Sequence, residues 1–181
     1  MVYVLLANGF EEIEALAPVD ILRRGGVDVK TVGITGKAVS GSHGITVEAD
    51  IPPEEVKDDI EMLIFPGGLP GSDNLHASEY TDKFIETAQK NNGHIAAICA
   101  APYILGVRGL LRGKKATCYP ADKFISLLDG ADYTANERVV TDGKITTAAG
   151  MGVACDFGVE LLSLLKGKDT ADGIAKGALI K

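Results

Sequence analysis

Short apolar runs alternate along the chain with longer segments in which apolar residues recur every three or four positions. The first run, residues 2–7, is apolar at every position, which is typical of a strand buried on both faces of a parallel sheet. Similar runs recur along the chain. We therefore expect strands at residues 2–7, 27–34, 61–65, 94–100 and 115–120.

Helix-like segments separate these runs. Residues 9–26 begin with acidic side chains and end with two arginines and two glycines, a polarity that matches the helix dipole and a glycine C-cap. Residues 80–93 are amphipathic and close on Asn-Asn-Gly. We also expect helices at 152–167 and 169–180, and hairpins at 37–51 and 138–148.

Strands that alternate with helices predict a mostly parallel central sheet with helices on both faces, an α/β fold. Ligands of such folds gather at the carboxyl ends of the strands. Three strand ends carry informative residues, Leu6–Asn8, Phe65–Gly68 and Ile98–Ala100. We expect these three ends to meet.

Composition narrows the class of protein. The 181 residues suit one domain spanning 1–181, and 46% hydrophobic residues are enough for a sizeable core. A net charge of -7 argues against nucleic-acid binding, and no apolar run approaches the length needed to span a membrane. The three cysteines and the absence of a leader-like N-terminus indicate a reducing cytoplasm.

Cys99 stands where a strand hands over to a helix that begins near Pro102. It is either a small core hydrophobe or a reactive thiol held at the turn. A helix N-terminus would lower its pKa and favour the thiolate. Ala100 and Ala101 leave room for a sharp turn around a nucleophile, although no G-x-S-x-G signature is present.

Glu14 is the second candidate, because its helical neighbours form an apolar face. It is either a solvated first-turn carboxylate or a buried group facing the strand ends, where burial would raise its pKa. Glu11 and Glu12 lie on other faces and are expected only to interact with the helix dipole. The glycines of "PGGLPG", including Gly68, allow backbone N–H groups to approach a reacting oxygen.

The three histidines and the two other cysteines give weaker evidence of function. They do not have the spacing of a metal site, so we expect neither a metal nor a cofactor. His94 opens a strand, His43 lies in a turn, and His76 is the histidine expected near the site. Cys118, in a strand, and Cys155, on an apolar helix face, are interpreted as structural.

The segments "NGFEEIEAL", "FPGG" and "AAICAAP", in this order, resemble the ThiJ/PfpI family, in the branch of the human Parkinsonism-associated protein and its bacterial relatives. The resemblance spans almost the whole chain. It implies a flavodoxin-like sandwich, usually a homodimer, with Cys99 as nucleophile and oxidation-sensitive thiol. It also implies that Glu14 is its protonated partner and that Gly68 and Ala100 donate backbone N–H groups. Gly67 and Tyr119 would line the pocket.

Three positions depart from that family pattern. Tyr119 stands where the branch has a histidine near the cysteine, so no Cys-His dyad is formed there. Ala149 replaces an arginine, which changes the charge expected of the pocket. His43 replaces a basic residue of the hairpin and is expected to alter the dimer contact.

The resemblance implies three alternative functions. The first is a glutathione-independent glyoxalase or deglycase acting on small reactive carbonyls, in which Cys99 attacks the aldehyde and Glu14 moves a proton between carbons. The second is a non-catalytic stress protein, a redox sensor or chaperone-like protein in which oxidation of Cys99 alters partner binding. The third is a cysteine peptidase or amidase, which the missing histidine disfavours.

Overall fold

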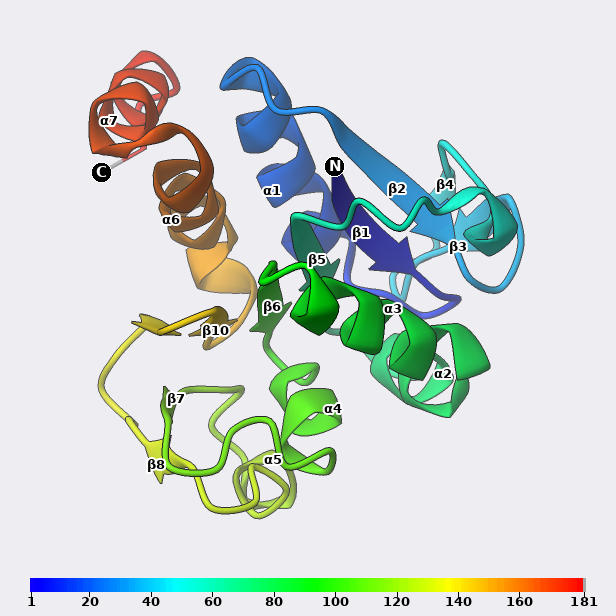
Figure 1. Cartoon of the computed structure of the whole chain (residues 1–181), viewed down its shortest axis with the longest axis vertical. Helices are drawn as coiled ribbons and strands as arrows, with labels where there is room; N and C mark the ends of the chain where they lie inside the picture. The colour runs from blue at the N-terminus through cyan, green and yellow to red at the C-terminus, as the bar shows by residue number, and fades with distance from the viewer. Residues whose placement is uncertain (181) are drawn as a thin grey trace.

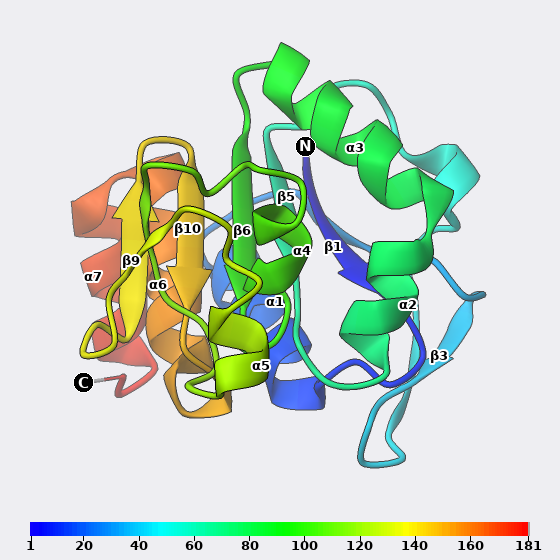
Figure 2. The same cartoon turned by 90° about the horizontal axis from the view of Figure 1, so that it is seen from below.

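The computed structural model describes residues 1–180, and Lys181, the last residue of the predicted domain, lies outside them. Its centre is a six-stranded sheet of order β2-β1-β5-β6-β10-β9. The strands are β2 (Val29–Gly33), β1 (Val2–Leu6), β5 (Met62–Phe65), β6 (His94–Ile98), β10 (Ile145–Ala148) and β9 (Val139–Asp142). All are parallel except β9, which pairs with β10 through the predicted hairpin, so their arrows oppose each other in Figure 2.

Helices cover both faces of this sheet (Figure 1). One side carries α1 (Glu12–Arg24), α6 (Ala154–Lys166) and α7 (Lys168–Gly177). The other carries α2 (Gly71–Ala77), α3 (Glu79–Lys90), α4 (Pro102–Gly106) and α5 (Asp122–Ile125). Two 3-10 turns, η1 (Pro53–Glu55) and η2 (Met151–Val153), complete the helical segments. The predicted three-layer, flavodoxin-like α/β fold is confirmed.

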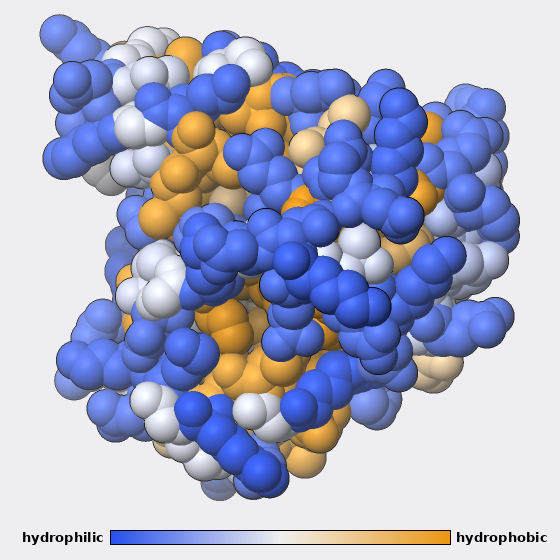
Figure 3. All heavy atoms as spheres, in the orientation of Figure 1, coloured by the Kyte–Doolittle hydropathy of each residue, from blue (hydrophilic) through white to orange (hydrophobic). Residues whose placement is uncertain are grey.

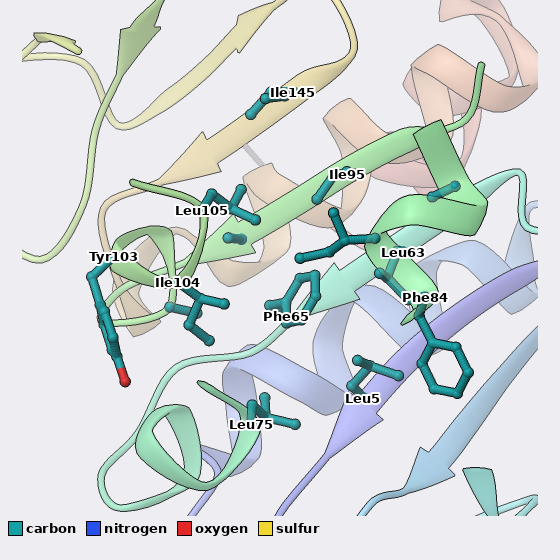
Figure 4. Packing of buried hydrophobic residues seen from close by; sticks show 14 of the residues in the cluster. Leu5, Leu63, Phe65, Leu75, Phe84, Ile95, Tyr103, Ile104, Leu105 and Ile145 are labelled. Carbon is teal, nitrogen blue, oxygen red and sulfur yellow. The ribbon is translucent and has the colours of Figure 1, made fainter. Parts of the chain in front are cut away.

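Alternation along the strands divides the core into two layers. In β1, Tyr3 and Leu5 point into the layer beneath α3 and α4, whereas Val2, Val4 and Leu6 point into the layer beneath α1 and α6. Both sets are fully buried because successive side chains of a strand face opposite sides. Figure 4 shows the first layer, where Leu5, Leu63 and Phe65 of the sheet pack near Phe84 of α3.

Two small sheets lie outside the central one. β3 (Ala38–Ser40) and β4 (Thr46–Glu48) form the predicted antiparallel hairpin. β7 (Lys115–Ala116) pairs with β8 (Asp132–Tyr133). The strand predicted at 115–120 is therefore only two residues long, because Thr117 and Tyr119 direct their N–H groups to Thr147 and Cys99 instead.

Hydrophilic residues cover most of the face drawn in Figure 3, and the apolar residues visible there gather in patches between them. Within residues 1–180, no helix has both the length and the apolar character needed to cross a membrane.

Candidate functional site

The carboxyl ends of β1, β5 and β6 meet, as expected, because these strands are parallel neighbours. Gly67, just after β5, lies between Glu14 and Cys99. A Cβ placed on it would lie 2.5 Å from Glu14 Oε2 and 2.7 Å from Cys99 Cβ. Only a residue without a side chain therefore allows Glu14 and Cys99 to close on this strand end.

Cys99 occupies a strained turn directly after β6. Its φ of 64° lies in the left-handed region, which costs a residue with a side chain about 1–2 kcal/mol. Two hydrogen bonds hold the backbone there: Cys99 N–H donates to Ala148 O and Cys99 O accepts from Tyr119 N–H, each at 2.8 Å. The residue is partly exposed, unlike the buried Cys118. This arrangement places the thiol at the edge of the core, where it is partly exposed.

Glu14 is completely buried, so the solvated alternative is wrong. Its Oε2 accepts the N–H of Gly67 at 3.0 Å, whereas Oε1 has no hydrogen-bond partner in residues 1–180. Burial raises the pKa of this carboxyl to about 7, against the lowering effect of the Cys99 thiol beside it. Near neutral pH the group therefore exchanges readily between acid and carboxylate.

The pKa of the Cys99 thiol departs from the sequence-based expectation. We expected the helix after Cys99 to lower it, but burial raises it, and the charge of Glu14 raises it further. The helix that follows, α4, has only five residues and therefore a small dipole. The two groups titrate as a pair, so protonation of Glu14 removes the repulsion that opposes the thiolate.

Two backbone N–H groups face the sulfur of Cys99, those of Gly68 and Ala100, and both lower the thiol pKa. Neither has a backbone acceptor among the described residues. Gly68 adopts a φ of 87°, which a side chain would oppose. Both donors therefore stabilise negative charge at this end of the site.

Cys99 opens into a pocket of about 350 Å³. Its lining residues come from six segments: Glu11, Ser42, His43, Gly68, Leu69, Cys99, Ala100, Tyr119, Lys123 and Phe124. Tyr119 lies at this pocket as expected, with its ring edge-on to Phe124. Gly67 does not line it; it is buried and positions Glu14 instead.

His43, and not His76, is the histidine of this pocket, so the prediction for His76 is wrong. His76 lies at the end of α2, where its Nδ1 is 2.9 Å from Arg108 Nη1. The β3–β4 turn carries His43 back to the start of α1. Spacing along the sequence gave no signal of this contact, because it depends on how the hairpin docks.

Glu12 is also more than a partner of the helix dipole. It is buried, and its Oε2 is 2.9 Å from His43 Nδ1, while Oε1 accepts the backbone N–H of His43 at 2.7 Å. Burial alone would raise the pKa of Glu12, but these hydrogen bonds outweigh it and hold the pKa at about 2. Glu12 is therefore a carboxylate at neutral pH.

Glu11, Glu12 and His43 present potential ligand atoms within 4.8 Å of one another. Both Glu12 oxygens are already used by the turn, and Glu11 Oε2 accepts the Glu14 N–H at 2.7 Å as the N-cap of α1. This donor set is better explained as the joint between helix and hairpin than as a metal site.

The two other cysteines lie away from this pocket. Cys118 is buried, as a structural cysteine should be, but it follows β7 and is not part of the strand. Cys155 is exposed, so its interpretation as a structural cysteine on an apolar helix face is wrong. The helix directs Ala154, Phe157 and Leu161 into the core, which turns Cys155 to solvent.

Comparison with known proteins decides the family. The sequence profile of the DJ-1/PfpI family matches residues 1–164. The chain belongs to this family. It is 35% identical to the protein dj-1beta of Drosophila melanogaster, over 98% of this chain and 95% of that protein. The crystal structure of Drosophila DJ-1beta superposes with a TM-score of 0.93 and covers 99% of this chain and 97% of that one.

Other members of the family differ in length or carry a functional name. The DJ-1 homolog B of Arabidopsis thaliana is 38% identical over 94% of this chain, which spans 39% of that longer protein. A protein of Caenorhabditis elegans named glutathione-independent glyoxalase DJR-1.2 is 29% identical, over 92% of this chain and 88% of that protein.

Proposed function

We propose that this DJ-1/PfpI protein is a cysteine-dependent enzyme acting on small reactive carbonyls, as a glutathione-independent glyoxalase or deglycase. One observation carries the proposal. Cys99 stands on a strained turn beside the buried carboxyl of Glu14, with the backbone N–H groups of Gly68 and Ala100 facing its sulfur. A nucleophile, an acid–base group and oxyanion donors thus share one small pocket.

The chemistry follows for a 2-oxoaldehyde such as methylglyoxal. The sulfur of Cys99 bonds to the aldehyde carbon and the carbonyl oxygen takes the thiol proton, which gives a hemithioacetal. The negative charge that develops on that oxygen faces Gly68 and Ala100. Glu14, as carboxylate, then removes the proton from this carbon and returns it to the neighbouring one. The hydroxyl proton moves to the neighbouring carbonyl oxygen at the same time, which gives a thioester of a 2-hydroxy acid.

Water then cleaves the thioester, releasing lactate and the free thiol. The overall reaction is methylglyoxal plus water to lactate, and the oxidation of one carbon balances the reduction of the next. A Glu14 pKa of about 7 suits a group that must both accept and donate this proton near neutral pH. The glyoxalase name carried by the C. elegans relative supports the same reaction class.

A second function uses the same atoms without turnover. A sulfinate formed from Cys99 would accept hydrogen bonds from Gly68 and Ala100, and protonated Glu14 would donate to it. Peroxide supplies the oxygen atoms, each transfer releasing water or alcohol. Cys99 would then be an oxidation sensor in stress response, with partner binding or chaperone-like behaviour as its output.

Methylglyoxal turnover separates these functions. We expect activity in the wild type and in Cys155→Ser, which alters an exposed thiol away from the pocket. We expect loss of activity in Cys99→Ala and in Glu14→Gln. Turnover that survives in Cys99→Ser would exclude an enzyme whose nucleophile is Cys99. If the wild type shows no turnover, the oxidation sensor becomes the better-supported function.

The same proposal includes a cytoplasmic homodimer. The family likeness supports a dimer, and the exposed side chains of Ile13 in α1 and Ile45 in the hairpin offer apolar surface for it. Light scattering on the purified protein measures its mass directly, and a monomeric mass would contradict this part.

A further inference from the structure

The hairpin turn brings a histidine to the rim of the Cys99 pocket, where His43 lines it together with Tyr119 and Lys123. The reaction above gives this imidazole no role. Cleavage of the thioester also requires a base that takes a proton from water, and none of the residues described so far supplies it.

Glu12 fixes which nitrogen of His43 is available. Nδ1 is 2.9 Å from Glu12 Oε2. A carboxylate only accepts hydrogen bonds, so Nδ1 carries the proton, and the neutral ring keeps its lone pair on Nε2. Nε2 has no hydrogen-bond partner within the described part of the chain, and the side chain is 71% exposed. The basic nitrogen is therefore not held by another group of the described chain.

The turn is held rigidly against the start of α1. Gly9 N–H donates to Ser40 O at 2.7 Å, and Ser42 N–H donates to Phe10 O at 2.8 Å. A Cβ on Gly41 would lie 2.3 Å from Glu12 Oε1, so the backbone of the turn rests directly on the carboxylate. His43 is thus placed by several independent contacts and not by one flexible side chain.

We propose that His43, oriented by Glu12, is the acid–base residue that activates water to release the acyl group from Cys99. Nε2 takes a proton from water as the water oxygen bonds to the thioester carbon. The carbon–sulfur bond then breaks, and the leaving sulfur receives that proton. Glu12 is a positioning residue, since it acts through His43. This inference rests on the proposed carbonyl function.

The charges around His43 predict how this step depends on pH. Glu12 of α1 and Glu11, the N-cap of that helix, lie beside His43. Lys123 of α5 and Cys99, directly after β6, line the same pocket. The hydrogen bond and charge of Glu12 raise the His43 pKa. Because the step needs the neutral ring, release should slow below that pKa.

Single-turnover mass spectrometry with methylglyoxal tests the proposal in His43→Ala. We expect Cys99 to be modified at the wild-type rate, while release slows about 100-fold, the scale of one lost acid–base group. The modified form should accumulate, react with hydroxylamine as thioesters do, and be released faster when imidazole is added. His76→Ala, an exposed histidine away from the pocket, should behave as wild type.

Unchanged release in His43→Ala, or slowed release that imidazole does not restore, would overturn the proposal. Glu12→Gln should shift the low-pH limb of release to lower pH, and an unshifted limb would overturn the role of Glu12. If wild-type Cys99 forms no adduct and produces no lactate, the proposed carbonyl function itself fails, which is a distinguishable result.

Discussion

Glu14 and Cys99 meet across Gly67, whose N–H donates to Glu14 Oε2 at 3.0 Å and whose missing side chain leaves room for both residues. This relationship joins the starts of α1 and α4 to the end of β5. The carboxyl of Glu14 and the thiol of Cys99 therefore titrate as a coupled pair. Four predictions follow from this pair and from the contact between Glu12 and the β3–β4 turn.

Glu14→Gln should lower the pKa of the Cys99 thiol. The carboxylate raises that pKa by repelling the thiolate, and an amide of similar size removes the charge. The pH dependence of alkylation by iodoacetamide measures the change, with Glu11 left intact and Glu86→Gln, an exposed carboxylate on α3, as the control. Carbonyl turnover should fall about 100-fold because the acid–base group is gone. An unchanged alkylation profile would contradict the coupling.

Glu14→Gln should also change how stability depends on pH. Folding raises the Glu14 pKa from 4.5 to about 7, so the folded state binds the proton more tightly than the unfolded state. The wild type therefore loses stability as pH rises from 4.5 to 7, by about 3 kcal/mol at most. The variant should lack this loss. Urea unfolding at pH 4.5 and 7.5 measures the difference, and parallel curves for both proteins would contradict it.

Gly67→Ala should disrupt the pair while leaving the fold in place. The added methyl group would lie 2.5 Å from Glu14 Oε2 and 2.7 Å from Cys99 Cβ, so one of them must move. We expect carbonyl turnover to fall at least 10-fold, on the scale of a misplaced reacting group. Circular dichroism and kinetics on Gly152→Ala, where a Cβ would meet nothing within 4 Å, give the control.

Gly41→Ala should displace the hairpin from Glu12, because its Cβ would overlap Oε1 at 2.3 Å. The buried carboxylate then loses hydrogen bonds from His43 and Ile45. We expect a stability loss of about 1–3 kcal/mol, the usual cost of an unsatisfied buried polar group. Thermal unfolding measures it, and Gly173→Ala in α7, with open space around its Cβ, should show no loss. Equal melting temperatures for Gly41→Ala and wild type would contradict this docking.

The local pattern of apolar and polar residues was sufficient to predict most strands of the central sheet, the longer helices and the meeting of three strand ends. Apolar runs such as residues 2–7 can only be buried, and parallel neighbours must bring their carboxyl ends together. Short elements such as α2 and β8 have too few residues to show a period, and the strand at 115–120 was overestimated because its backbone pairs with Cys99 and Thr147.

The sequence by itself determined the α/β architecture, the family motifs and the position of Cys99 at a strand end. Only the tertiary structure decided the environment of each side chain. Burial beside the end of β5 raises the Glu14 pKa, and docking of the hairpin lowers the Glu12 pKa. The same docking brings His43, and not His76, to the pocket that Cys99 lines. The reason is physical: pKa values and contacts depend on which groups folding removes from water together, and residues distant in sequence supply those groups.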